Sequence, residues 1–226
     1  LHTLFPYTTL FRSPLSLAAK VPKGDVKRQD IMGVYVFENF LFGIKMTGAQ
    51  LKNWLEWSVR YYAQVEKSTD PIVKDSVLNT ANYNLDQLYG ATYDIDLTKA
   101  ACTVDSKGKV ISGSRIKNLK INGVLVKDAE VLKVAVNNYR YNGGGGFMVA
   151  AGFIPGAKAT IDATFYDSAK ALGDDGQVRN MMFKYVQDKG TITPTLENNW
   201  KISTSPVKQD TTTSGISAPK IGRAHV

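Results

Sequence analysis

Two stretches of alternating apolar and polar residues predict strands. Residues 34–46, VYVFENFLFGIKM, place one apolar set on one face, namely Phe40, Phe42, Ile44 and Met46. Residues 89–97, YGATYDIDL, alternate as clearly, with the apolar positions Tyr89, Ala91, Tyr93, Ile95 and Leu97 opposite Thr92, Asp94 and Asp96. Each stretch is therefore expected to bury one face of a sheet.

Two further runs complete the predicted β-structure. Residues 115–126, RIKNLKINGVLV, carry Asn122-Gly123 between β-rich segments, the strongest short signal for a hairpin. Residues 131–136, VLKVAV, predict another strand, which leads directly into NNYRYNGGGGF at 137–147. Because glycine weakens a fold unless the native backbone needs it, the four glycines indicate a close approach of the main chain to another backbone or a ligand.

The 3.6-residue period predicts two helices. Thr47 is the expected N-cap of the first, with Gln50 in the position of a capping box. Its buried face is expected to hold Leu51, Trp54, Leu55, Ser58, Val59 and Tyr62. Asp174 is the expected N-cap of the second, with Gln177 three residues on and Gly190 at its end. The buried face of the second helix is expected to hold Val178, Met181, Met182, Tyr185 and Val186.

The order of these elements predicts an α+β domain. Strands cluster in the middle of the chain with a helix on either side, which favours a mixed or antiparallel sheet with packed helices. Residues 66–86 are polar and predict a long loop. With 43% hydrophobic residues, we expect one domain over residues 14–205. Residues 206–220, ending in TTTSGISAPK, are expected to form a linker.

The two ends of the chain resemble translated sequencing adaptors. Residues 3–13, TLFPYTTLFRS, and residues 221–226, IGRAHV, match the peptides that such oligonucleotides encode. We therefore expect residues 1–13 and 221–226 to be artefacts and exclude them from fold reasoning. Both histidines, His2 and His225, lie in these ends.

Composition narrows the classes of function. The chain contains no apolar run near the roughly 18 residues that span a membrane, so no span is predicted. Cys102 is the single cysteine, which excludes an internal disulfide. The net charge of +8 comes from basic residues spread along the chain rather than from a dense block. A solvated basic surface is therefore favoured over binding to a nucleic-acid polymer.

The residues between the adaptor-like ends offer little catalytic chemistry. Residues 14–220 contain no histidine, which excludes a Ser-His or Cys-His pair and the usual metal cluster of a hydrolase. No phosphate-cradling P-loop motif occurs. The paired carboxylates Asp94 and Asp96, and likewise Asp174 and Asp175, are more typical of a solvated edge than of an acid–base pair. The sequence therefore favours a binding domain, with no catalytic residue.

Aromatic and amide side chains offer a binding chemistry. Tyr83 lies in ANYNLDQLYG and Tyr139 in NNYRYN, each among asparagines. Aromatic rings stack on planar bases, amides read base edges, and glycines let a backbone approach a ligand. An equally open alternative at this point is that both tyrosines pack in the core and the glycines form a loose loop.

Five segments together resemble the C-terminal domain of the 5'-nucleotidase family, and most closely its bacterial 2',3'-cyclic-nucleotide 2'-phosphodiesterase/3'-nucleotidase branch. They are VYVFENFLFGIKMTGAQLKNWLEWS (34–58), NYNLDQLYGATYDIDLT (82–98), RIKNLKINGVLV (115–126), VAVNNYRYNGGGGF (134–147) and NNWKI (198–202). The resemblance covers nearly all of residues 14–202 in the right order.

The resemblance implies a nucleoside-binding domain that follows, in the same chain, an N-terminal metallophosphoesterase domain with two divalent metal ions. It places the base between two rings, Tyr139 and, as the best candidate, Tyr83. The same pocket would be lined by Asn82, Asn84, Asn137, Gly143, Gly144, Gly145 and Gly146, with Phe147 anchoring the loop in the core. It implies a bacterial protein located in the periplasm, outside the cell or in the cell wall. A fragment without the metal domain is expected to be catalytically inactive.

Two departures from the family pattern bear on this expectation. Many 5'-nucleotidases carry an aspartate, thought to hold the ribose, where this chain has Gly145, which favours the cyclic-phosphodiesterase branch. The family's first strand, with a GG-x-R type of motif, is not visible.

The competing hypothesis is a non-enzymatic envelope module for binding or adhesion. A third hypothesis, an RNA-binding domain, would require that binding weakens steeply with salt.

Overall fold

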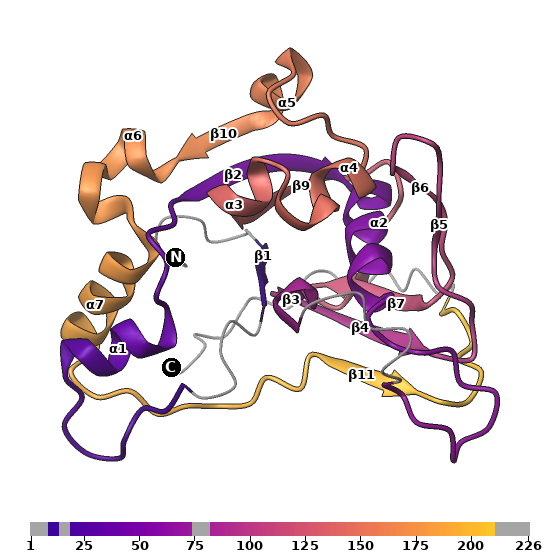
Figure 1. The fold of residues 1–226 in the computed structure, drawn as a ribbon, viewed down its shortest axis with the longest axis horizontal. Helices are drawn as coiled ribbons and strands as arrows, with labels where there is room; N and C mark the ends of the chain where they lie inside the picture. The colour runs from indigo at the N-terminus through magenta and orange to yellow at the C-terminus, as the bar shows by residue number, and fades with distance from the viewer. Residues whose placement is uncertain (1–8, 14–18, 74–81, 211–226) are drawn as a thin grey trace.

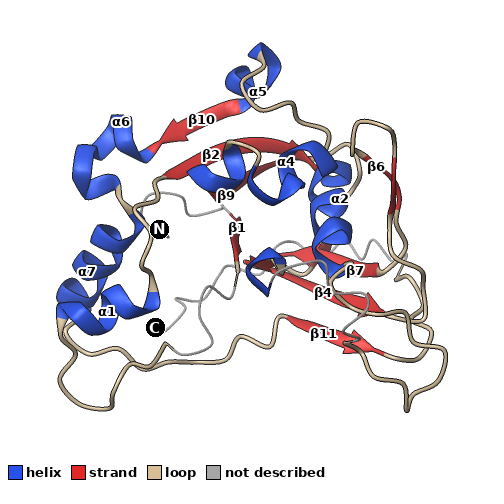
Figure 2. Cartoon of the chain, in the orientation of Figure 1, coloured by secondary structure: helices blue, strands red, loops and turns tan. Residues whose placement is uncertain are grey.

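The computed structural model describes residues 9–13, 19–73 and 82–210 (Figure 1). Among these, helices pack on a five-stranded and a four-stranded sheet, as Figure 2 shows, and a short two-stranded ribbon lies beside them. This arrangement confirms the predicted α+β class. Parts of three predicted segments lie outside the described residues: 74–81 of the long loop, 211–220 of the linker, and residues 1–8 and 221–226 of the ends.

The five-stranded sheet has the order β10-β2-β9-β1-β3. Its central pair, β2 and β9, is antiparallel and unbroken from Leu41 opposite Asn137 to Thr47 opposite Val131. Strand β1 is parallel to β9, and the other pairs are antiparallel, so the sheet is mixed. The strands are β1 (Thr9–Arg12), β2 (Leu41–Thr47), β3 (Gln87–Tyr89), β9 (Val131–Asn137) and β10 (Thr164–Asp167).

The four-stranded sheet has the order β11-β4-β7-β8. The predicted hairpin forms its edge: Asn122 and Gly123 adopt φ of 52° and 78°, the left-handed values that such a turn requires. Strand β11, late in the chain, lies parallel to β4 (Figure 1). The strands are β4 (Ala91–Asp96), β7 (Ile116–Ile121), β8 (Val124–Leu125) and β11 (Trp200–Ser203), and the ribbon consists of β5 (Thr103–Val104) and β6 (Val110–Ser112).

The helices are mostly short. The α-helices are α1 (Arg28–Val34), α2 (Gly48–Val59), α3 (Asn138–Tyr141), α4 (Phe147–Ala150), α5 (Lys158–Ala163), α6 (Ser168–Leu172) and α7 (Val178–Lys189). The 3-10 turns are η2 (Asn82–Asn84), η3 (Gly144–Gly146) and η4 (Gly173–Gly176). Within the described ranges, no helix has both the length and the apolar character to cross a membrane.

Helix α2 forms as predicted and supplies much of the core. The Thr47 hydroxyl accepts a hydrogen bond from the Gln50 amide at 3.2 Å, and the Gln50 side chain accepts one from the Thr47 amide at 2.9 Å. This reciprocal capping box satisfies two amides that the helix itself leaves unpaired. The predicted apolar face is buried throughout, from Leu51 and Trp54 to Tyr62. The Trp54 ring stacks on Phe11 of β1 with centroids 4.5 Å apart.

The predicted strand over residues 34–46 is wrong in its first half. Strand structure begins at Leu41: Val34 is the last residue of α1, residues 35–39 form a connection, and Phe40 makes an isolated bridge to Gln177. Helix α1 itself is held by tertiary contacts, because the Arg28 guanidinium lies 4.6 Å from the Phe183 ring of α7 and Ile31 is buried. Val36 and Phe37, in the connection, are exposed. The alternation at these positions therefore reflects no sheet.

The predicted start and buried face of the second helix also need correction. Gln177 occupies the N-cap position of α7 without a side-chain capping hydrogen bond, and Asp174 lies instead in the preceding turn η4. That turn approaches α6 closely, since an added Cβ on Gly176 would clash with the Ser168 carbonyl. The buried residue of α7 is Phe183, whereas Tyr185 is 41% exposed. Gly190 ends the helix at a φ of 68°, as predicted.

The adaptor-like residues 9–12 lie inside the five-stranded sheet as β1, between β9 and β3. Phe11 is buried there against Trp54. The strand thus occupies a place in the sheet that no strand within the described residues 19–40 supplies. The adaptor origin of the two ends, and the domain limits drawn from it, stay predictions.

Asp96 corrects the expectation of a solvated edge on β4. Its carboxylate is fully buried and accepts hydrogen bonds from the Thr98 hydroxyl at 2.6 Å and amide at 3.1 Å. It also accepts one from the Val207 amide at 3.2 Å, so it holds the described end of the chain against the sheet. Burial by itself would raise the pKa of Asp96, but these hydrogen bonds and Lys99 lower it below its ordinary value. Asp174 and Asp175 are exposed, as expected.

Candidate functional site

The two predicted stacking rings are both at the surface. Tyr83 lies in the turn η2, and Tyr139 lies in the first turn of α3, which the Asn137 side chain caps by accepting from the Arg140 amide at 2.8 Å. Tyr83 is 47% exposed and Tyr139 45% exposed. The alternative in which both tyrosines pack in the core is therefore wrong, and each ring presents apolar surface to solvent.

Arg140 joins the segments that carry the two rings. Arg140 is 3% exposed, and its Nη2 donates to the Tyr83 carbonyl at 2.6 Å. Its Nη1 donates to the Asn84 side chain at 2.9 Å and to the Gly144 carbonyl at 3.2 Å. Its Nε and Nη2 donate to the two carboxylate oxygens of Asp86 at 3.1 and 2.7 Å. One guanidinium thus connects Tyr83, Asn84, Asp86 and the glycine run.

Asp86 in turn is fixed to the core. It is 2% exposed, and its carboxylate accepts from the Trp54 indole at 3.0 Å and from the Ser13 hydroxyl at 2.7 Å. Its carbonyl accepts from the Ser58 hydroxyl at 2.7 Å. Two of these donors lie on the buried face of α2. The Arg140–Asp86 ion pair is therefore anchored to helix α2.

The glycine run is required by the close packing of the loop itself. Gly143, Gly145 and Gly146 adopt φ of 101°, 71° and 76°, values that side chains disfavour. An added Cβ on Gly144 would lie 2.5 Å from Cζ of the Tyr139 ring. One on Gly145 would meet the Arg140 guanidinium and the Asn84 side chain. The sequence predicted that the glycine backbone closely approaches another group. In the structure that group is the side chains of Tyr139, Arg140 and Asn84.

Two aromatic residues support this loop from beneath. The Trp57 indole donates to the Gly145 carbonyl at 2.9 Å. Phe147 is buried, lies 5.2 Å from the Trp54 ring centroid to centroid, and has the Arg140 guanidinium 4.1 Å above its own ring. Phe147 therefore sits beneath the loop as an anchor, as expected, and has little surface with which to touch a ligand.

The structure brings together most of the predicted set. Tyr83, Asn84 and Gly144 are hydrogen-bonded to Arg140, whose guanidinium also lies 5.3 Å from the centroid of the Tyr139 ring. Asn137 caps the helix that carries Tyr139 and Arg140. Asn82 begins the same turn as Tyr83. Three residues of the network were missed, namely Arg140, Asp86 and Trp57. The sequence contained a signal for Arg140: an arginine between two tyrosines, directly before a glycine run, could have been predicted to pair with a buried carboxylate.

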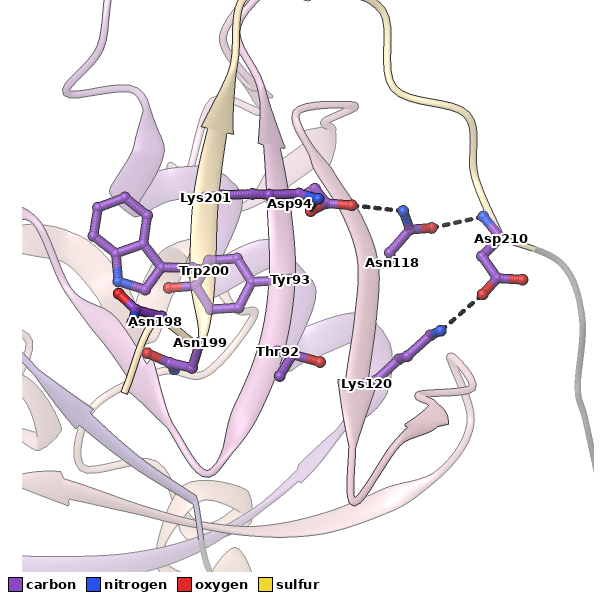
Figure 3. Close-up of a pocket in the computed structure, with 10 residues that line it drawn as sticks. All are labelled: Thr92, Tyr93, Asp94, Asn118, Lys120, Asn198, Asn199, Trp200, Lys201 and Asp210. Atoms are coloured by element: carbon purple, nitrogen blue, oxygen red, sulfur yellow. Dashed lines mark hydrogen bonds and ion pairs between the residues drawn. The ribbon is translucent and has the colours of Figure 1, made fainter. Parts of the chain in front are cut away.

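A separate polar groove of about 300 Å³ lies on the four-stranded sheet, where it meets the end of the described chain (Figure 3). Figure 3 shows Asn118 linked to both Asp94 and Asp210. Lys120 pairs with Asp210 at 2.7 Å and Lys201 with Asp94 at 3.4 Å. These charges neutralise one another, and the groove contains none of the predicted ring or glycine residues.

The described residues contain no group of three or more His, Cys, Asp or Glu side chains able to hold a metal ion. The ring site itself offers a buried and neutralised ion pair, two exposed rings and a tight backbone loop.

The comparisons with known proteins agree with the resemblance seen in the sequence. The sequence model of the family described as 5'-nucleotidase, C-terminal domain, matches residues 9–152, a range that begins inside the adaptor-like end. The trifunctional nucleotide phosphoesterase protein YfkN of Bacillus subtilis is 30% identical over 202 residues, which cover 88% of this chain and 13% of YfkN. The 2',3'-cyclic-nucleotide 2'-phosphodiesterase/3'-nucleotidase of Haemophilus influenzae is 30% identical over 190 residues, 80% of this chain and 26% of the relative.

Solved structures show the same fold. A putative 5'-nucleotidase from Staphylococcus aureus superposes with a TM-score of 0.63 at 20% identity, covering 89% of this chain and 34% of its own. The 5'-nucleotidase precursor from Thermus thermophilus gives a TM-score of 0.63 at 20% identity, covering 91% of this chain and 33% of its own. The chain thus spans about a third or less of the proteins it matches. It belongs to the family of 5'-nucleotidase C-terminal domains.

Proposed function

We propose that this chain is the nucleoside-binding domain of a bacterial nucleotide hydrolase, and that Tyr83 and Tyr139 stack on the two faces of the base. The observation that carries the proposal is the Arg140 network, which fixes the segments of both rings while leaving each ring nearly half exposed. Two aromatic rings that each expose nearly half of their surface are suited to stacking on a heterocycle.

The names of the relatives support the substrate class. The matched proteins from Haemophilus influenzae and Salmonella typhimurium are 2',3'-cyclic-nucleotide 2'-phosphodiesterase/3'-nucleotidases, and YfkN is a nucleotide phosphoesterase. The substrate proposed for the whole protein is therefore a nucleoside 2',3'-cyclic phosphate or a 3'-nucleotide. Asn84, Asn137 and the main chain of the glycine loop are the proposed polar partners of the base and ribose.

The hydrolytic step is assigned to a metallophosphoesterase domain that precedes this one in the same protein. That domain would supply two divalent metal ions, and the present chain would bind and orient the nucleoside. We propose a periplasmic or extracellular location for the whole protein. Upstream gene sequence separates this proposal from a non-enzymatic envelope module, because the hydrolase requires D-x-H and G-N-H-(D/E) motifs there.

Calorimetric titration of the chain with adenosine and 3'-AMP tests the pocket directly. Tyr139→Ala and Tyr83→Ala are each expected to weaken binding by about 1–3 kcal/mol, the value of one stacking face. Thermal unfolding should change little, because neither ring is buried. Tyr185→Ala, at a 41% exposed position on α7, is the matched control and should bind as the unaltered chain does. Unchanged affinity in Tyr139→Ala would refute the ring assignment.

A further inference from the structure

Both rings lack the burial that would hold them in place by packing alone. Tyr83 and Tyr139 are 47% and 45% exposed, so packing holds each ring only in part, and its position also depends on the backbone segments around it. A base can be stacked on two faces only when the two backbones keep a fixed separation. The residue that connects these backbones is therefore as important for binding as the rings themselves.

Arg140 is that connection, and its donors are fully used. A guanidinium has five N–H donors. Five acceptors lie within 3.2 Å: the two carboxylate oxygens of Asp86, the Asn84 side chain, and the carbonyls of Tyr83 and Gly144. Its charge is neutralised by a carboxylate that is itself 2% exposed. No donor remains for a phosphate or a base, so Arg140 acts through other residues.

We propose that Arg140 is a positioning residue that sets the separation between the Tyr83 segment and the Tyr139–glycine segment. The proposal rests on the proposed function of the ring pair. Through Asp86 the guanidinium is tied to Trp54 and thus to α2, so the two segments are held against a rigid element. Lysine could not replace it, because an ammonium has three donors on one atom and cannot span the same acceptors.

The experiment compares Arg140→Lys with Arg115→Lys. Arg115 is also buried, 1% exposed, and donates to the carbonyls of Val59, Tyr62 and Lys99, none of which belongs to the ring site. Both variants keep a positive charge but replace a buried guanidinium by an ammonium with fewer donors, so both should lower the free energy of unfolding. The readouts are adenosine affinity well below the unfolding temperature and amide hydrogen exchange along the chain.

Arg140→Lys is expected to lower adenosine affinity roughly tenfold, the order of one lost stacking face. Exchange should accelerate at residues 83–86 and 144–146, while Arg115→Lys leaves adenosine affinity and the exchange at those residues unchanged. Equal losses of affinity in the two variants, or unchanged affinity and exchange in Arg140→Lys, would overturn the positioning role.

Two outcomes need separate treatment. If the unaltered chain binds no adenosine, the proposed function fails, and exchange alone decides the role of Arg140: acceleration confined to the two segments supports it, and uniform or absent acceleration overturns it. If Arg140→Lys does not fold, Asn84→Ala takes its place, because it removes one acceptor at a partly exposed position. Faster exchange at residues 83–86 in that variant supports the proposal, and unchanged exchange contradicts it.

Discussion

The backbone of Gly144 lies against the ring of Tyr139, with room for no Cβ between them. An ideal Cβ on Gly144 would be 2.5 Å from the ring atom Cζ and 2.6 Å from the Tyr139 carbonyl oxygen. Contacts below 3.0 Å force a shift, and here one of the two partners is backbone. The absence of a side chain at Gly144 therefore allows the position that the Tyr139 ring adopts.

Gly144→Ala is expected to displace the Tyr139 ring and to weaken adenosine binding by about as much as loss of the ring, roughly 1–3 kcal/mol. Overpacking should also reduce the free energy of unfolding by about 1–3 kcal/mol. Titration calorimetry and urea unfolding measure the two effects. Gly33→Ala in α1 is the control, because a Cβ there meets nothing within 4 Å and should stabilise the helix slightly. Normal binding by Gly144→Ala would show that the ring position does not matter.

The buried carboxylate of Asp96 predicts acid sensitivity. Its pKa is lowered below the unfolded value of 3.8, because the hydrogen bonds from Thr98 and Val207 outweigh the opposing effect of burial. Between the folded and unfolded pKa values, the unfolded chain binds more protons than the folded one. The stabilisation is therefore complete above pH 3.8 and is lost as the pH falls through the folded pKa.

Asp96→Asn should flatten that acid limb of the stability curve. It should also lower the free energy of unfolding at neutral pH by about 1–3 kcal/mol, because its amide nitrogen cannot accept the bonds that a carboxylate oxygen accepts. Urea unfolding at a series of pH values checks both effects. Asp175→Asn, at an exposed position, should leave the curve unchanged. An unaltered acid limb in Asp96→Asn would mean that another carboxylate dominates.

The purified chain is expected to release no phosphate from 3'-AMP or from a 2',3'-cyclic nucleotide when Mn²⁺ or Zn²⁺ is added. The described residues bring together no metal-holding group, and the chain spans 26% of its Haemophilus influenzae relative. A phosphate-release assay measures this, with a mock purification from the same host as the control for contaminating phosphatases. Metal-dependent release above that control, abolished by a chelator, would place catalytic chemistry inside this chain.

Local sequence signals were accurate where a single element decides the structure. The Thr47–Gln50 capping box, the Asn122-Gly123 turn, the Gly190 stop and the buried face of α2 all follow from short-range stereochemistry and the helical period. Alternation over residues 34–40 misled, because α1 ends at Val34 and Phe40 makes an isolated bridge to Gln177, which lies far away in the sequence. The capping residue of α7 was missed for a similar reason, since the turn before it packs on Ser168.

By itself the sequence determined helix α2, the Asn122-Gly123 hairpin and the family, because helical period, turn residues and motif order are local features of the chain. The residue types left the exposure of Tyr83 and Tyr139 open, and the tertiary structure decided it. The tertiary structure alone decided that Arg140 meets Asp86, 54 residues away, and that Asp96 is buried beneath Val207. A buried charge is stable only beside its partner, and that partner comes from a segment whose distance along the chain no local pattern encodes.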